Sequence, residues 1–115
     1  MVRPAAVVAA VLMASVSLSA TREDLARART LFNERKFDQA IAAAELARKT
    51  PDTADAAAIV LARAHLERYR QVADPADLGA ARAALGSANV EKLGTPDRAE
   101  YLIGLGGSLF LEDDF

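Results

Sequence analysis

The chain has 115 residues, enough for one small domain, and its 52% hydrophobic and 26% charged residues are the balance of a globular protein rather than a disordered one. A formal net charge of -2 with dispersed basic residues leaves no electrostatic footprint for a phosphate backbone, so nucleic acid is not expected as a partner. The absence of cysteine excludes disulfides, thiolate metal sites and cysteine nucleophiles.

Residues 1–20, MVRPAAVVAAVLMASVSLSA, have the layout of a secretory signal peptide. Arg3 lies near the start, an uncharged apolar stretch runs over residues 5–14, and small Ser and Ala residues follow, with cleavage expected after Ala20. A retained membrane anchor and a cytosolic helix are the alternatives, although the stretch is short and weakly hydrophobic for a span of about 20 residues. We therefore expect a periplasmic or secreted protein with no stable membrane span in the mature chain.

From Thr21 onward the apolar residues recur at helical spacing, and no stretch alternates as a half-buried strand would. Residues 21–115 are therefore predicted to form an all-α domain of about five helices. The charged turn at residues 33–36 is short, so the first two helices should be antiparallel. Their buried sides are expected to carry Leu25, Ala28, Leu31 and Phe32, and then Phe37, Ala40, Ile41, Ala44 and Ala47.

Three further helices are each predicted to begin at a short polar residue followed by proline, namely at Thr50-Pro51, Asp74-Pro75 and Thr95-Pro96. An acid near each start, at Asp52, Asp77 and Asp97, suits the positive end of the helix dipole. The residues expected to be buried are Ala58, Leu61, Ala62, His65, Leu66 and Tyr69 in the third helix, Leu78, Ala81, the stem of Arg82 and Leu85 in the fourth, and Leu102, Leu105, Gly106 and Leu109 in the fifth.

One short motif occurs twice, as LFNERKF at residues 31–37 and LFLEDDF at residues 109–115. The later copy, with Leu102, Leu105-Gly106, Leu109-Phe110 and Phe115, resembles the first helix and turn of a tetratricopeptide repeat, with Leu in place of both aromatic residues. The earlier copy fits the same frame through Ala28, Leu31-Phe32, Phe37, Ala40 and Ala47, although Arg27 stands where Leu is expected. A generic array of helical hairpins and an unrelated helical bundle are the alternatives.

The resemblance implies an α-solenoid of antiparallel helical hairpins whose small residues let neighbouring helices approach closely. The middle unit, residues 53–86, departs from the pattern, because Ala62 and Ala81 are further apart than Ala28 and Ala40, so a longer helix or loop is expected there. The frame also expects a second helix after Phe115, so the domain should continue beyond residue 115. The residues assigned to repeat packing are Ala28, Leu31, Phe32, Phe37, Ala40, Ala62, Ala81, Leu105, Gly106 and Leu109.

In tetratricopeptide arrays the first helices of successive hairpins line a concave groove that receives a peptide or a partner helix. The resemblance therefore implies a protein or peptide partner, bound without catalysis, and a role in interaction or scaffolding in the cell envelope. Arginines in such a groove could grip carboxylates of the ligand. The alternative is a solvated charged face with pairs such as Arg63 with Glu67. The matching positions are Arg22, Arg29, Asn33, Arg63, Glu67 and Arg70.

No catalytic, cofactor-binding or metal-binding residue is predicted. His65 is the only histidine and is interpreted as a packed helix residue, while IGLGGS at residues 103–108 lacks the spacing and the preceding strand of a phosphate loop. The acids at residues 112–114 are interpreted as turn residues.

A second hypothesis for the function is that the repeats are the N-terminal appendage of a longer enzyme or transport component, which the sequence beyond Phe115 would decide. A third is a self-associating structural unit, which sizing in solution would test.

Overall fold

The computed structural model describes residue 20 and residues 22–112, and every element in this part is helical. A helix over residues 22–33 is followed by α2 (Phe37–Ala47), α3 (Pro51–Val72), α4 (Pro75–Ser87), the short 3-10 helix η1 (Val90–Lys92) and α5 (Thr95–Glu112). The prediction of an all-α domain with five helices is confirmed for the described residues. The predictions for residues 1–19 and for Asp113, Asp114 and Phe115 lie outside them.

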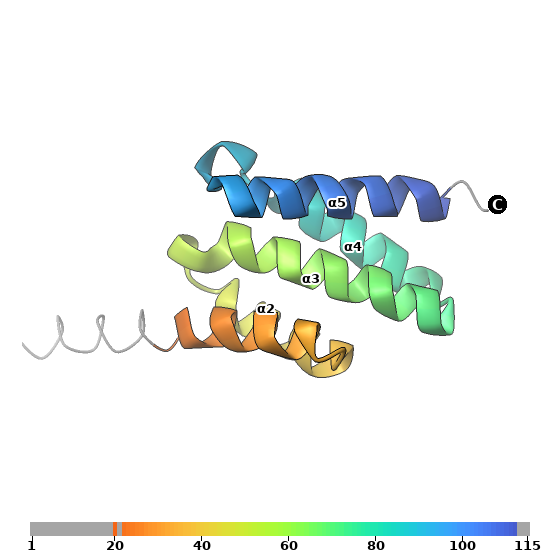
Figure 1. Ribbon diagram of the computed structural model, residues 1–115, viewed down its shortest axis with the longest axis horizontal. Helices are drawn as coiled ribbons and strands as arrows, with labels where there is room; N and C mark the ends of the chain where they lie inside the picture. The colour runs from red at the N-terminus through yellow and green to blue at the C-terminus, as the bar shows by residue number, and fades with distance from the viewer. Residues whose placement is uncertain (1–19, 21, 113–115) are drawn as a thin grey trace, which may run out of the picture.

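The helices form two layers around α3. Figure 1 shows the helix at residues 22–33, α3 and α5 side by side in a front layer, with α2 and α4 behind them. Helix α3 packs against α2, α4 and α5, and α4 also packs against α5. Each back-layer helix therefore lies near the junction between two front-layer helices.

Helix starts follow the sequence signals closely. Thr50 is the residue before α3 and Pro51 its first residue, while the Asp74 carboxylate before α4 accepts a hydrogen bond from the backbone N–H of Ala76 at 3.0 Å. Helix α5 begins at Thr95 itself. Proline fits these positions because the first helical N–H has no partner within the helix.

Two helices end through residues in the left-handed region. Arg35, with φ 63°, turns the chain after residue 33, and the Lys36 N–H donates to the Leu31 carbonyl at 2.9 Å. Ala73, with φ 58°, ends α3, and its N–H donates to the Tyr69 carbonyl at 2.7 Å. These hydrogen bonds satisfy carbonyls that the helix leaves without an internal partner.

Alanines hold the core together by bringing helices close. Ala28, Ala40, Ala62 and Ala81 are all 0% exposed. Leu31 and Phe37 are also buried, while Phe32 is partly buried and meets Phe37 edge to face, with ring centroids 5.5 Å apart.

The longer middle unit is explained by helix length rather than by a loop. Helix α3 has 22 residues, twice the 11 residues of α2. The predicted buried side of α3 is correct except that Tyr69 is only partly buried. In α4, Leu78 is only partly buried, and Arg82 as a whole residue is exposed. That helix is rotated, and its buried residues are Asp77, Ala81, Ala84 and Leu85.

The predicted buried side of α5 is also wrong. Leu102 and Leu109 are 64% and 54% exposed, Gly106 is exposed, and Leu105 is only partly buried. Gly104 and Ser108 are buried instead, and a Cβ at position 104 would meet Cδ2 of Leu85 at 3.4 Å. The inner side of α5 thus has the small residues Gly104 and Ser108 between Tyr101 and Leu111, which are partly buried and pack against the core.

Candidate functional site

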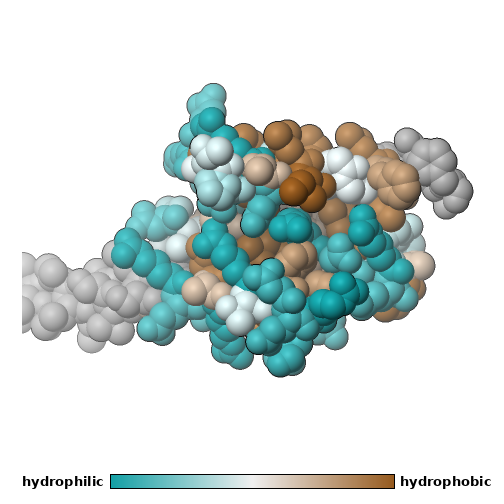
Figure 2. All heavy atoms as spheres, viewed as in Figure 1, coloured by the Kyte–Doolittle hydropathy of each residue, from teal (hydrophilic) through white to brown (hydrophobic). Residues whose placement is uncertain are grey.

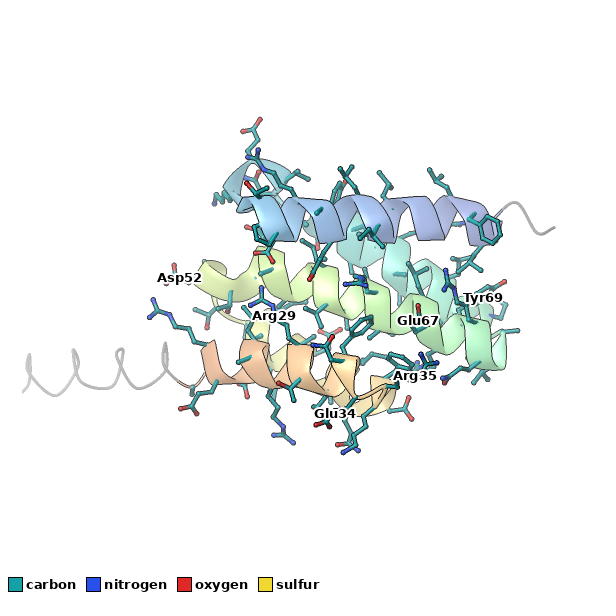
Figure 3. All side chains as sticks on the ribbon, viewed as in Figure 1. Arg29, Glu34, Arg35, Asp52, Glu67 and Tyr69 are labelled. Carbon is teal, nitrogen blue, oxygen red and sulfur yellow. The ribbon has the colours of Figure 1, made fainter. Side chains whose placement is uncertain are left out.

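Two hollows in the front layer share Arg63 as a lining residue, and we name them together the front groove. The first hollow lies between residues 22–33, α3 and α5, and the second continues between α3 and α5. Figure 3 shows Arg29 and Glu67 on this face, from different helices. The lining residues are Arg29, Phe32, Asn33, Val60, Arg63 and Glu100 in the first hollow, and Arg63, Leu66, Glu67, Arg70, Ile103, Gly104 and Gly107 in the second.

The structure brings together nearly all the residues predicted to contact a partner. Arg29, Asn33, Arg63, Glu67 and Arg70 line the front groove. Arg22 is exposed and does not line either hollow. The sequence did not predict that α5 lines the groove, because it does not decide which side of that helix packs inward.

The arginines of the groove are held by carboxylates from other positions. Nη2 of Arg29 donates to Oδ1 of Asp97 at 3.0 Å, which joins the first helix to α5. Arg63 lies 3.8 Å from Oε2 of Glu100. Both pairs are partly exposed, so each contributes little to stability and a ligand carboxylate can compete for the guanidinium.

Two further contacts set the chemistry of the groove. The Arg63 guanidinium lies 4.7 Å from the centre of the Phe32 ring, in cation–π geometry. Arg70 donates to Glu67 at 3.3 Å. The structure therefore pairs Glu67 with Arg70 and Arg63 with Glu100, and not Arg63 with Glu67 as the alternative interpretation expected.

The two hollows of the groove are small. They have volumes of about 80 and 100 Å³. Sites for drug-sized ligands are typically about 300 to 1,000 Å³. Hollows of this size accommodate single side chains rather than a drug-sized molecule.

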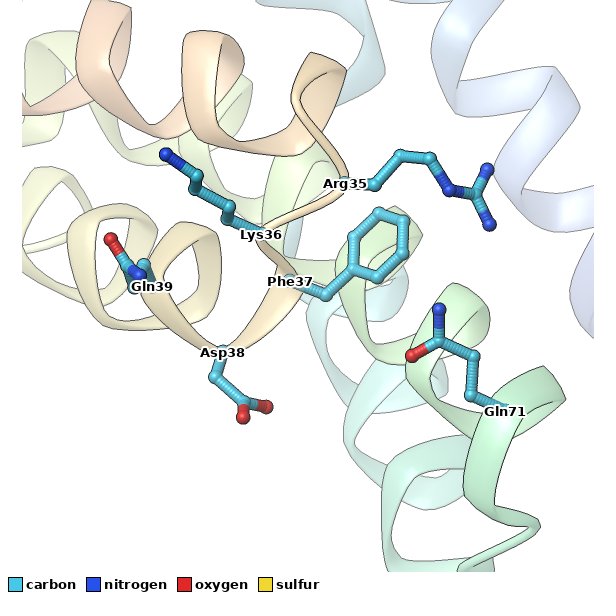
Figure 4. Close-up of a pocket in the computed structure, with 6 residues that line it drawn as sticks. All are labelled: Arg35, Lys36, Phe37, Asp38, Gln39 and Gln71. Carbon is cyan, nitrogen blue, oxygen red and sulfur yellow. The ribbon is translucent and has the colours of Figure 1, made fainter.

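A separate hollow of about 210 Å³ lies at the turn before α2, shown in Figure 4. Its charged residues have partners: Lys36 pairs with Glu34 at 3.1 Å, and Asp38 pairs with Arg68 at 3.1 Å. Sequence reasoning did not predict it. The residues around it are Arg35, Lys36, Phe37, Asp38, Gln39 and Gln71.

A buried polar cluster joins three helices behind the front groove. Oδ1 of Asp77 lies 2.8 Å from Nδ1 of His65, and Nε of Arg68 donates to Oδ1 and Oδ2 of Asp77 at 2.9 and 3.1 Å. Arg68 also donates to Asp38 on α2 at 3.1 Å. Because Asp77 and His65 are 1% and 8% exposed, the cluster connects α2, α3 and α4 rather than presenting a group to a substrate.

The charge of Asp77 is maintained inside the protein. Burial by itself would raise the pKa of this carboxyl, but hydrogen bonds and charge from Arg68 and His65 outweigh burial and hold the pKa below its ordinary value. The hydrogen bond to Asp77 likewise raises the pKa of the Arg68 guanidinium. An ionised Asp77 accepts hydrogen bonds only, so the Nδ1 of His65 carries the proton between them.

Within the described residues, no three His, Asp or Glu side chains are arranged to hold a metal ion. No helix in that part of the chain is long and apolar enough to cross a membrane.

Comparison of the chain with models of known protein families, with curated proteins and with solved structures found no match.

Proposed function

We propose that this chain is a tetratricopeptide-like, non-catalytic module that binds a protein or peptide in its front groove. The observation that carries the proposal is that Arg29 and Asn33 of the first helix lie along the same groove as Arg63, Glu67 and Arg70 of α3. Spacings of three and four residues place each set on one face of its own helix, and the packing of the two helices brings these faces together.

The layering of the helices also supports the proposal. The helix at residues 22–33, α3 and α5 share the front layer, and α2 and α4 lie behind them (Figure 1). Ala28, Ala40, Ala62 and Ala81 are fully buried, as close packing of successive hairpins requires. A groove lined by front-layer helices is a rigid site, since its side chains stand on helices rather than loops.

The chemistry of the groove indicates an acidic ligand with an apolar side chain. Arg29, Arg63 and Arg70 offer three guanidinium groups to carboxylates, which they can bind bidentately. Leu66 and Ile103 offer apolar surface next to them. The occupant we propose is an extended or helical segment with Asp or Glu on either side of a Leu, Phe or Met.

Export to the periplasm or the cell exterior is part of the proposal and rests on residues 1–20. The full chain fused to alkaline phosphatase, which is active only after export, should give activity that is lost on Leu12→Arg, a charge placed in the apolar stretch. Sequencing of the mature N-terminus should begin at Thr21. Activity that persists in the Leu12→Arg fusion would contradict export by this segment.

The binding proposal is tested with a random peptide library displayed on phage and selected on the full chain. Enriched peptides should carry acids around one apolar residue, and Arg63→Glu should reduce their affinity by about tenfold or more, because it opposes the ligand charge. Arg48→Glu, directly after α2 and outside the groove, is the matched control and should bind as the unchanged chain does. Loss of enrichment for acidic peptides, or equal affinity in both variants, would refute the proposal.

A further inference from the structure

The second hollow of the front groove is bordered by two residues without a side chain. Gly104 and Gly107 line it from α5, and Leu66 and Arg70 are among the residues that line it from α3. Figure 2 shows hydrophobic surface along α5 beside the hydrophilic side chains of the front layer. The lining combines the apolar Leu66 and Ile103 with charged groups, and the volume of about 100 Å³ has room for several water molecules.

The two glycines have different surroundings. Gly104 is buried, and a Cβ at that position would meet Cδ2 of Leu85 at 3.4 Å, so this glycine belongs to the packing of α5 against α4. Gly107 is only partly buried. A Cβ at position 107 would lie 3.6 Å from Cδ1 of Leu66 and 4.0 Å from Nη2 of Arg70, and both of these residues line the second hollow. A longer side chain at position 107 would therefore extend into the hollow and fill it.

The earlier copy of the internal motif has a long side chain at the corresponding position. When residues 31–37 are aligned with residues 109–115, Arg29 aligns with Gly107. Arg29 lines the first hollow, and its Nη2 donates to Oδ1 of Asp97 at 3.0 Å. The aligned position thus borders the groove in both copies, but the side chain that occupies the groove in the first copy is missing from α5.

The next step rests on the proposed function, in which the front groove binds an acidic peptide with an apolar residue. We propose that the second hollow receives this apolar residue, which we name the anchor, and that Gly107 determines how large the anchor can be. The anchor side chain lies against Leu66 and Ile103, in the space that a side chain at position 107 would fill. Its burial removes apolar surface of both the peptide and the groove from water.

Arg70 offers a partner for an acid next to the anchor. Its side chain is 51% exposed, and it pairs with Glu67 of the same helix at 3.3 Å. An exposed pair of this kind contributes little to stability, so a peptide carboxylate can replace Glu67 at the guanidinium. The hollow therefore places an apolar contact and a carboxylate contact side by side, in keeping with an acid beside the anchor.

Selection from the phage library on the full chain separates this inference from the proposed function. On the unchanged chain and on Gly106→Val, enriched peptides should carry acids around a Leu, Met or Phe anchor. On Gly107→Val the acids should remain, because the arginines are unchanged, but Gly, Ala or Ser should replace the large anchor. Absence of acids on the unchanged chain would refute the proposed function, and this inference with it. Acidic peptides that keep a large anchor on Gly107→Val would overturn this inference alone.

Gly106→Val is the matched control because it makes the same chemical change one residue earlier in the same helix. Gly106 is exposed, has nothing within 4 Å of a Cβ, and lines neither hollow. Both substitutions place a β-branched residue inside α5, so their effects on the helix itself should be alike.

A smaller substitution separates loss of the hollow from a change in the fold. A Cβ at position 107 makes only ordinary van der Waals contacts, and alanine favours a helix over glycine, so Gly107→Ala should fold at least as stably as the unchanged chain. Thermal unfolding followed by circular dichroism checks the stability of each variant.

Fluorescence anisotropy then measures the affinity for a peptide enriched on the unchanged chain and for the same peptide with its anchor replaced by Ala. Gly107→Ala should weaken binding of the anchored peptide by about fourfold, and Gly107→Val by about tenfold or more. Both variants should bind the Ala-substituted peptide within about twofold of the unchanged chain, because the space that they fill is then not used. Unchanged affinity for the anchored peptide in both variants, or an equal loss in Gly106→Val and Gly107→Val, would overturn the proposal.

Discussion

Asp77 and His65 belong to different helices, yet Oδ1 of the aspartate lies 2.8 Å from Nδ1 of the histidine and both residues are almost fully buried. Arg68 completes the cluster with two hydrogen bonds from Nε to the Asp77 carboxylate. The cluster fixes the rotation of α4 against α3, because a buried carboxylate is stable only while its partners are in place.

Asp77→Asn should lower the free energy of unfolding by about 3 kcal/mol, since it leaves Arg68 without its buried counter-charge. Urea denaturation followed by circular dichroism measures the change. Asp38→Asn is the matched control, because Asp38 pairs with the same arginine at 3.1 Å but from a side chain that is 82% exposed. Asp38→Asn should lower the free energy of unfolding by less than about 1 kcal/mol. Similar losses of unfolding free energy in the two variants would show that the burial of Asp77 does not determine how much it stabilises the fold.

Stability should fall in acid through the same residue. The pKa of Asp77 is lower in the folded chain than in the unfolded chain, so the unfolded state binds the proton more readily. The contribution of Asp77 is therefore complete above the unfolded pKa of about 4 and is lost as pH falls below it toward the folded pKa. Urea midpoints measured from pH 6 downward should fall less steeply in Asp77→Asn; an identical slope in both chains would contradict this assignment.

The sequence predicted the alanines at helix contacts more accurately than the buried polar residues. Ala28 and Ala40 are recognisable because alanines recur at helical spacing beside Leu and Phe, and only one face of each helix can be buried. Asp77 was interpreted as one more acid at a helix start, like Asp52 and Asp97. Nothing local distinguishes the three, since burial of Asp77 depends on Arg68 and His65, which belong to another helix.

The face of α5 could not be predicted for a related reason. One side of the helix has large apolar residues such as Leu102 and Leu109, and the other has Gly104 and Ser108. Hydrophobicity favoured the first side, whereas the fold packs the second against Leu85 and Leu66. Of the α3 residues that line the front groove, Arg63, Glu67 and Arg70 were named from the sequence, whereas Glu100 and Gly104 of α5 follow only from this orientation.

Helix contact through Ala40 can be tested by adding volume. Ala40→Leu should lower the free energy of unfolding by about 1 to 3 kcal/mol, because Ala40 is 0% exposed and the added methyl groups force neighbouring helices apart. Ala42→Leu, on the exposed side of the same helix, should change stability by less than about 0.5 kcal/mol. Thermal unfolding of both variants measures the difference. A neutral Ala40→Leu variant would mean that the helices do not meet closely at this position.

The end of α3 offers a change that should increase stability. Ala73 has φ 58°, a conformation that costs a residue with a Cβ roughly 1 to 2 kcal/mol and costs glycine little. Ala73→Gly should therefore raise the free energy of unfolding by about 0.5 to 1 kcal/mol, after subtraction of the greater freedom of glycine in the unfolded chain. Ala83→Gly changes an exposed residue in an ordinary helical position of α4, and it should instead lower the free energy of unfolding by about 1 kcal/mol. Urea denaturation measures the change in the free energy of unfolding for both variants. Changes of opposite sign would show that the effect comes from the backbone conformation at Ala73. A loss of stability in both variants would show that α3 does not end in the left-handed conformation.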